Sequence, residues 1–212
     1  PLSELLDNLD AAHVRHYGAS DYAVTDNGGD WTVHLVGAVA GPAMMENLYL
    51  CDYWTGRTDS SVWIQEFVDL VLRWKPVGWA EEQGQISKSL GSVIDLEQQR
   101  QNAWCVRSQM SVSGDKAQRA QAFRALAAQK RVYLPRRAPW AKDFLDRLVR
   151  FGATTRDDDH DAAGLLGRLA FGMRGGKEIP RLPGVPKAGT FDYLLWVTEQ
   201  QRGAQRSIYR SR

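Results

Sequence analysis

The sequence predicts an α/β fold built on a mixed β-sheet flanked by helices. Three short runs rich in β-branched and aromatic residues open the chain, and turn residues separate them. Helical periodicity and short apolar runs then alternate, which gives the order β-β-β-α-β-α-β-α-β-α-α. Consecutive short strands favour antiparallel pairing, whereas strands joined through helices favour parallel pairing, so the sheet should contain both kinds.

The first half of the chain is predicted to hold the three opening strands, a helix and a fourth strand. The opening strands lie at residues 16–24, 31–40 and 47–54, and residues 26–29 (DNGG) form a strong turn signal. Residues 60–74 place apolar side chains on one helical face; Ser60 or Ser61 can cap this helix, and Pro76 ends it. The apolar run at residues 77–80 is typical of a strand buried on both faces.

The second half continues the alternation of strands and helices. We predict a strand around residues 104–110, a helix at about residues 115–129 and a strand at residues 132–134. A further helix begins near Pro139, and its apolar stripe makes Trp140 a core residue rather than a platform for stacked bases. The last helix begins at Asp157. Residues 1–171 are assigned to one domain, and residues 172–212, rich in glycine, proline and arginine, to an arm and basic tail.

The amino-acid composition limits the classes of protein to which the chain can belong. The chain has 212 residues, of which 43% are hydrophobic, so it can bury a sizeable core. It has no run of about eighteen apolar residues, which excludes a membrane-spanning helix. It begins at Pro1 without a secretory signal, and we expect it to be one part of a longer protein. Cys51 and Cys105 are expected to be buried free thiols in a reducing, cytosolic compartment.

Charge is distributed unevenly, although the net charge is only +2. Residues 1–106 carry 15 acidic groups against 6 Lys or Arg, whereas residues 107–150 carry 11 basic groups against 3 acidic ones. Residues 174–212 add 8 basic groups against 3 acidic ones. Solvated helix faces would explain this pattern, and so would a protein that holds metal ions on one side and a polyanion beside them.

Three groups of acidic residues stand where an α/β protein can build a metal site. Asp21 lies inside the first strand, where an acid without a partner is disfavoured. Glu81 and Glu82 follow the apolar run, at a strand end where open α/β sheets commonly present their sites. Residues 157–161 (DDDHD) open the last helix with four acids, which repel one another unless a cation lies between them.

Each group also has a structural explanation. Glutamates at a strand end are commonly solvated, and acids at a helix N-terminus are stabilised by its dipole. Together, however, carboxylates supply the oxygen ligands that Mg²⁺ and Mn²⁺ prefer, and two such ions about 4 Å apart can hydrolyse a phosphodiester. The acidic candidates for such a site are Asp21, Glu81, Glu82, Asp157, Asp158 and Asp161.

Over about residues 16–170 the sequence resembles the nuclease domain of bacteriophage large terminases, a member of the ribonuclease H-like superfamily. Six segments carry the resemblance, in the same order along the chain. They are residues 18–25 (GASDYAVT) with 29–32 (GDWT), 48–57 (LYLCDYWTGR), 63–76 (WIQEFVDLVLRWKP), 115–120 (DKAQRA), 131–151 (RVYLPRRAPWAKDFLDRLVRF) and 156–162 (RDDDHDA). Two positions depart from the family pattern: Arg156 stands where His is usual, and Gly152 where Pro commonly follows Phe.

The resemblance implies a ribonuclease H-like mixed sheet and a metal-dependent endonuclease that cuts concatemeric viral double-stranded DNA during genome packaging. Asp21, one of Glu81 or Glu82, and Asp157 or Asp158 would hold two divalent ions, Mg²⁺ or Mn²⁺, with Asp161 one helical turn further. No Walker loop is present, so the chain resembles the nuclease half without its ATPase motor. The implied partners are double-stranded DNA and, in the full protein, an ATPase domain, a small terminase and a portal, in the host cytoplasm.

Several further residues have two interpretations. Lys116 and Arg119, at a helix start, could contact DNA phosphates, and an internal salt bridge would explain them as well. Arg136 and Arg137, in the basic stretch, are also predicted to bind DNA. Asp30 is interpreted as a turn residue, with the rim of the site as the alternative. Asp52 is expected to make a cross-strand polar contact, and His160 to be a bystander rather than a proton shuttle, because it projects away from Asp157 and Asp161.

Two other functions fit the same residues. Another ribonuclease H-like DNA nuclease, such as a resolvase, would share the metal site but prefer branched DNA. A non-catalytic module that binds DNA or a portal would not need the metal.

Overall fold

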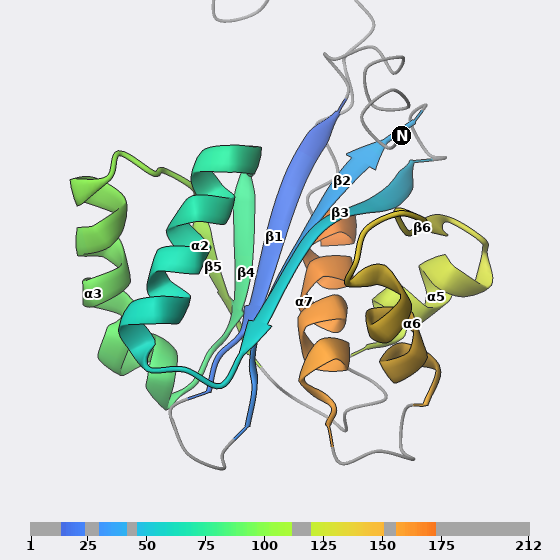
Figure 1. The fold of residues 1–212 in the computed structure, drawn as a ribbon. Coiled ribbons are helices and arrows are strands. Elements are labelled where there is room, and N and C mark those ends of the chain that lie inside the picture. The colour runs from blue at the N-terminus through green and yellow to red at the C-terminus, as the bar shows by residue number, and fades with distance from the viewer. Residues whose placement is uncertain (1–13, 24–29, 42–45, 112–119, 151–155, 173–212) are drawn as a thin grey trace, which may run out of the picture. The chain divides into compact units, whose positions relative to one another are not determined.

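The computed structural model describes residues 14–23, 30–41, 46–111, 120–150 and 156–172. Its centre is a six-stranded sheet with the strand order β5-β4-β1-β2-β3-β6 (Figure 1). The strands are β1 (Arg15–Asp21), β2 (Thr32–Ala40), β3 (Asn47–Gly56), β4 (Gly78–Glu82), β5 (Arg107–Met110) and β6 (Val132–Tyr133). The strand predicted around residues 104–110 is shorter in the structure, where β5 begins at Arg107 and the side chains of Trp104 and Val106 are exposed.

The sheet is mixed, as predicted. Strand β2 pairs antiparallel with both β1 and β3, so the first three strands form a meander. The pairs β1–β4, β4–β5 and β3–β6 are parallel. Each parallel neighbour is reached through a helical connection, as parallel pairing requires.

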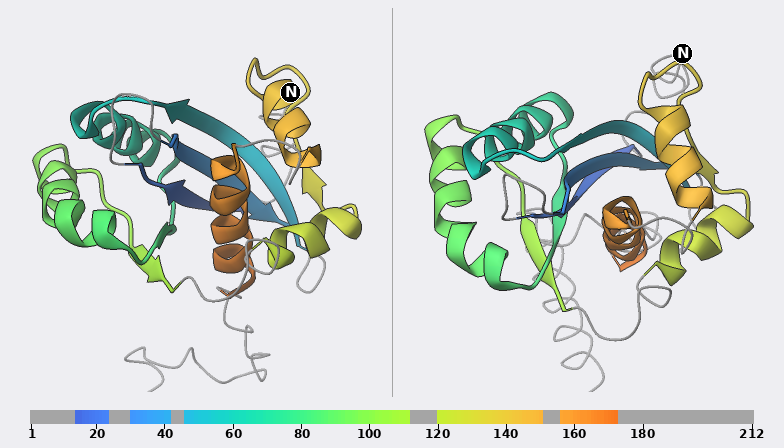
Figure 2. Two further views of the ribbon diagram at one scale, coloured as in Figure 1. Left: turned by 90° about the horizontal axis from the view of Figure 1, so that it is seen from below. Right: turned by 60° about the horizontal axis from the view of Figure 1, so that its bottom comes forward.

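Helices cover both faces of the sheet (Figure 2). One face carries α2 (Ser60–Trp74) and α3 (Gln85–Arg100). The other carries α5 (Gln121–Ala128), α6 (Ala141–Val149) and α7 (Asp158–Gly172). Among the described residues no helix is long and apolar enough to span a membrane.

The core under α2 is aromatic. Trp63 and Phe67 of α2 are buried against Trp79 of β4, whose indole lies over Gly18 in the neighbouring strand. The N-cap of α2 is Asp59, which accepts hydrogen bonds from the backbone N–H groups of Ser61 (2.9 Å) and Val62 (3.3 Å). The cap is therefore one residue before the predicted Ser60 or Ser61, since a carboxylate can accept both bonds at once.

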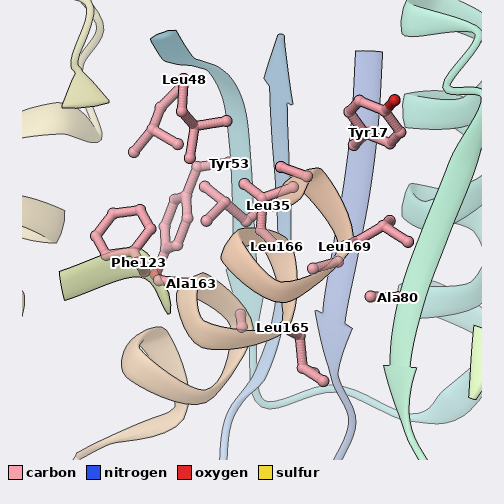
Figure 3. Packing of buried hydrophobic residues seen from close by; sticks show 14 of the residues in the cluster. Tyr17, Leu35, Leu48, Tyr53, Ala80, Phe123, Ala163, Leu165, Leu166 and Leu169 are labelled. Atoms are coloured by element: carbon pink, nitrogen blue, oxygen red, sulfur yellow. The ribbon is translucent and has the colours of Figure 1, made fainter. Parts of the chain in front are cut away.

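The core on the opposite face is aliphatic and is centred on α7 (Figure 3). Leu166 and Leu169 of α7 pack against Leu35 of β2 and Tyr17 of β1. Small residues let the helix approach closely. A Cβ on Gly37 would lie 3.1 Å from Leu166, and a Cβ on Gly167 would lie 2.8 Å from the backbone of Phe123 in α5. The last helix is thus held directly against the strands that carry Asp21 and Glu82.

Helix α3 is the element that was least well predicted from the sequence. The predicted order contains a helix before residue 104, but no residues were assigned to it. Its buried side chains are only Ser87, Ile94 and Gln98, so it lacks a broad apolar stripe. Its start is marked by Ser87 Oγ, which accepts from the backbone N–H of Gly84 (3.0 Å).

Four predictions fall wholly or partly outside the described residues. They are the turn at residues 26–29, the first part of the helix at residues 115–129, the segment around Gly152, and the arm and tail beyond residue 172.

We predict that Gly18→Ala strongly destabilises the protein, because the new Cβ would lie 2.0 Å from the Trp79 ring. The expected loss in the free energy of unfolding is about 3 kcal/mol. Gly91→Ala is the matched control: its Cβ would meet only Arg107 Nη2 at 3.8 Å, and a mid-helix Gly→Ala change stabilises by about 0.5–1 kcal/mol. Urea denaturation followed by circular dichroism measures both changes, and equal effects would contradict the packing described.

The stability of the fold should also depend on the protonation of His34. This side chain is buried, with Nε2 2.9 Å from the Trp63 carbonyl oxygen and Nδ1 2.7 Å from Ser20 Oγ. Because a carbonyl only accepts, Nε2 carries the proton and Nδ1 accepts from the serine. Burial lowers the pKa of His34 to about 4, against an ordinary histidine value of 6.5.

As the pH falls, the unfolded chain therefore protonates His34 near pH 6.5, whereas the folded chain does so only near pH 4. Between these two values the protonated unfolded state is favoured, so the free energy of unfolding decreases as the pH falls. The slope is at most about 1.4 kcal/mol per pH unit. His34→Gln removes the titration, and the stability difference between wild type and variant should shrink from pH 7 to pH 4.5 in urea denaturation. A difference independent of pH would refute the assignment.

Candidate functional site

The ends of β1 and β4 place two acidic side chains next to each other. The parallel register pairs Ser20 with Glu81, so the next residues, Asp21 and Glu82, are neighbours at the C-terminal ends of the two strands. Figure 1 shows the N-terminal end of α7 at this same edge of the sheet. The three predicted acidic groups therefore lie at the same edge of the sheet.

Strand alternation decides which face each acid occupies. Tyr17 and Ala19 of β1, and Ala80 of β4, belong to the core under α7. Residues two apart in a strand share a face, so Asp21 and Glu82 face α7. Both are half-buried.

Glu81 projects from the opposite face. Its carboxylate is 1% exposed and accepts two hydrogen bonds from Arg107 Nη2 of β5, at 3.0 and 3.1 Å. The same guanidinium donates to Asp95 Oδ1 (2.6 Å) and to the Gly91 carbonyl (3.1 Å) of α3. Burial and the charge of Glu81 raise the pKa of the neighbouring Tyr22 well above its usual value. The structure thus places Glu81 in an ion pair behind the sheet and does not bring it together with Asp21.

The first turn of α7 carries the remaining acids. The Asp157 carbonyl accepts from the backbone N–H groups of His160 (2.8 Å) and Asp161 (3.2 Å), so Asp157 is the N-cap residue of α7, which begins at Asp158. Asp158 is 6% exposed. Burial raises the pKa of Asp158, and the negative charges of Asp30 and Asp157 raise it further, whereas Arg156 lowers it. The negative charges of Asp30 and Asp157 therefore act on Asp158 at this end of the helix.

Asp159 has a different environment from its neighbours. It is fully buried, its Oδ2 accepts from Arg147 Nε of α6 (2.6 Å), and its Oδ1 accepts from the Tyr53 hydroxyl of β3. Arg156 Nε lies 3.4 Å from the same carboxylate. These contacts connect the start of α7 to β3 and α6, so Asp159 anchors the helix that carries Asp157 and Asp158.

Arginines gather beside the acids. Arg156 Nη2 donates to Thr55 Oγ1 (2.6 Å) and to the Tyr53 hydroxyl (3.2 Å), and its guanidinium lies 3.9 Å from the ring centre of Trp31. The guanidinium of Arg57 lies 4.8 Å from the same ring. The sequence identified neither Trp31 nor Arg57 as a functional residue, because their contact depends on how the ends of β2 and β3 pair.

The donor chemistry of this edge fits a hard divalent cation. Asp21, Glu82, Asp157, Asp158 and Asp161 offer carboxylate oxygens alone, which are ligands for Mg²⁺ or Mn²⁺ rather than for a soft metal. Within the described ranges, no three His, Cys, Asp or Glu side chains are placed closely enough to hold one ion as they stand. An ion shared by the strand ends and α7 would therefore require the two sets of carboxylates to approach each other.

The other predicted residues are placed as follows. Asp30 is exposed. Asp52 contacts a helix rather than the neighbouring strand, accepting from Arg73 Nη1 (2.7 Å) and Trp74 Nε1 (2.8 Å) of α2. His160 Nε2 lies 3.0 Å from the Leu148 carbonyl oxygen.

Trp140 packs on the core under α7, as predicted. Arg136 and Arg137 are exposed between β6 and α6, while Lys116 and Arg119 lie outside the described residues. The two cysteines are free and half-buried, and burial raises the pKa of each thiol to about 12.

The fold is similar to that of known DNA enzymes. A large terminase nuclease from the thermophilic phage G20c, solved with bound zinc, superposes with a TM-score of 0.51 at 15% identity, over 72% of this chain and 80% of that one. RuvC of Thermus thermophilus matches with a TM-score of 0.42 at 14% identity, over 74% and 97% of the two chains. The Holliday junction resolvase of fowlpox virus matches with a TM-score of 0.43 at 15% identity, over 74% of this chain and 99% of that one.

No protein-family model and no curated protein sequence matches the chain. At these identities the terminase match bears on the fold alone. Together with the mixed six-stranded sheet, it shows that the chain has a ribonuclease H-like α/β fold.

Glu81 and Glu82 project from opposite faces of the sheet, so we predict that their substitutions change the stability by different amounts. Glu81→Gln should lower the free energy of unfolding by about 3 kcal/mol, because it leaves the Arg107 guanidinium in a largely buried position without its charged partner. Glu82→Gln, at a half-buried strand end, should cost about 1 kcal/mol or less. Urea denaturation of both variants measures the difference, and a larger loss for Glu82→Gln would contradict the assigned faces.

Proposed function

We propose that the chain is a metal-dependent endonuclease that cuts double-stranded DNA. The observation that carries the proposal is the adjacency of Asp21 and Glu82 at the ends of two parallel strands, on the face where α7 begins with Asp157 and Asp158. In open α/β sheets, the C-terminal ends of the strands are where ligands bind. The ribonuclease H-like fold, shared with a terminase nuclease, supports the same reaction class.

The proposed metal ligands include Glu82 but not Glu81. Asp21, Glu82, Asp157, Asp158 and Asp161 would hold two ions, Mg²⁺ or Mn²⁺, whereas Glu81 is committed to Arg107. The ions would supply an activated water and neutralise charge on the leaving oxygen. Asp159 connects the first turn of α7 to α6 and β3 through Arg147 and Tyr53. In the proposed site this anchoring would present Asp157, Asp158 and Asp161 toward Asp21 and Glu82.

The biological role that we propose is cleavage of concatemeric viral DNA during genome packaging, in the host cytoplasm. The ordered resemblance of six segments to large terminase nucleases supports it, as does the similarity in fold to the nuclease of phage G20c. In that role the chain would act with an ATPase domain, a small terminase and a portal. Contacts to the DNA backbone would dominate binding, so sequence preference would be weak.

Replacement of Asp21 tests the proposal. Asp21→Asn should reduce the rate of nicking and linearisation of supercoiled plasmid in Mn²⁺ or Mg²⁺ by about 100-fold or more, because it removes a charged ligand without changing side-chain size. The matched control is Asp69→Asn, an exposed aspartate of α2 on the other face of the sheet, which should leave the rate unchanged. Gel electrophoresis of the plasmid forms, with and without chelator, measures the rates.

The outcomes separate the alternatives. Plasmid left intact by the wild type in every metal would indicate a binding module without catalysis. Cleavage that survives Asp21→Asn would show that the catalytic site lies elsewhere. A strong preference for four-way junctions over linear duplex would indicate a resolvase instead of a packaging nuclease.

A further inference from the structure

We propose that Trp31 and Arg57 form a binding site for a backbone phosphate of the DNA, next to the carboxylates of the proposed nuclease site. The inference rests on the proposed function and adds to it the direction in which the substrate strand runs across the sheet edge.

The strand register places this pair on the same edge as the acids. Asp21 of β1 pairs with Val33 of β2, and Val33 pairs with Thr55 of β3. Trp31 comes two residues before Val33 and Arg57 two residues after Thr55, so both extend past the ends of their strands at the edge where Asp21 lies. Strands β1 and β3 are two strand spacings apart, about 10 Å, which corresponds to roughly three axial steps of about 3.4 Å along a DNA strand.

The exposure and the contacts of Arg57 leave it able to bind an anion from outside the chain. Its side chain is exposed, and its guanidinium lies 4.8 Å from the ring centre of Trp31. Within the described part of the chain Arg57 makes no ion pair or hydrogen bond. Stacking on an indole holds the planar guanidinium in place while its N–H groups remain available at the edge, and this arrangement favours forked contacts to phosphate.

Neighbouring charges do not satisfy Arg57. Arg156 shares the indole but is turned inward, where it donates to Thr55 and lies 3.4 Å from Asp159. Asp59, two residues after Arg57, is engaged as the N-cap of α2. Exposed Asp30 precedes Trp31, and the charge of Asp30 acts on Asp158. Among the described residues, the edge is thus acidic at β4 and β1 and carries the exposed Arg57 at the end of β3. A phosphodiester strand lying over a metal site suits such a distribution of charge.

The test is binding of a short fluorescein-labelled duplex DNA by fluorescence anisotropy, with chelator present so that no cleavage occurs. Arg57→Gln should weaken binding about tenfold and reduce the slope of log K against log salt by about one. Arg57→Lys, which keeps the charge without the planar group, should recover part of the loss. Arg100→Gln is the control, because Arg100 is an exposed arginine of α3 on the other face of the sheet, paired with Glu97.

Each outcome bears on one proposal. Equal affinity and salt slope for wild type and Arg57→Gln would overturn the phosphate site, and so would an equal loss in Arg100→Gln. Such results leave the proposed function intact if Asp21→Asn still abolishes plasmid cleavage. If Asp21→Asn cleaves normally while Arg57→Gln binds DNA weakly, the phosphate site stands and the assigned metal site fails.

Discussion

The parallel pairing of β1 with β4 is the constraint on which the proposed site depends. It sets Ser20 opposite Glu81 and therefore Asp21 beside Glu82. A shift of one residue in this register would exchange the faces of the two glutamates, so that Glu81 would meet α7 and Glu82 would face Arg107. The indole of Trp79 fits the present register, because it lies over Gly18, where a Cβ would be 2.0 Å from the ring.

Two buried ion pairs on opposite faces hold the elements around this register. Behind the sheet, Arg107 connects Glu81 of β4 to β5 and to Asp95 of α3. In front of it, Arg147 connects Asp159 of α7 to α6, and the Tyr53 hydroxyl adds β3. Buried ion pairs contribute little net stability compared with apolar packing, but they are costly to break singly and thereby specify one arrangement. Here each pair includes a residue adjacent in sequence to a proposed metal ligand, so it orients that ligand's backbone.

Much of the fold follows from local patterns in the sequence. The opening strands stood out as β-branched and aromatic runs between turn residues, α2 by its apolar face and the last helix by its acidic start. The acidic groups stood out as unusual for their positions. The bounds of helix α3 were not predicted, because most of its side chains are polar and show no apolar face. The choice between Glu81 and Glu82 required the register of two strands separated by a long stretch of chain. Arg57 and Trp31 each look ordinary in sequence, and only the pairing of Thr32 with Gly56 brings them together.

The proposed function rests on a divalent ion held between the ends of β1 and β4 and the first turn of α7. The most direct measurement is an anomalous difference map from a crystal grown with Mn²⁺. We expect one or two peaks within ligand distance of the Asp21 and Glu82 carboxylates and of Asp157 or Asp158, with Glu81 still paired to Arg107. Peaks bound by Glu81, or Mn²⁺ found only away from this edge, would contradict it.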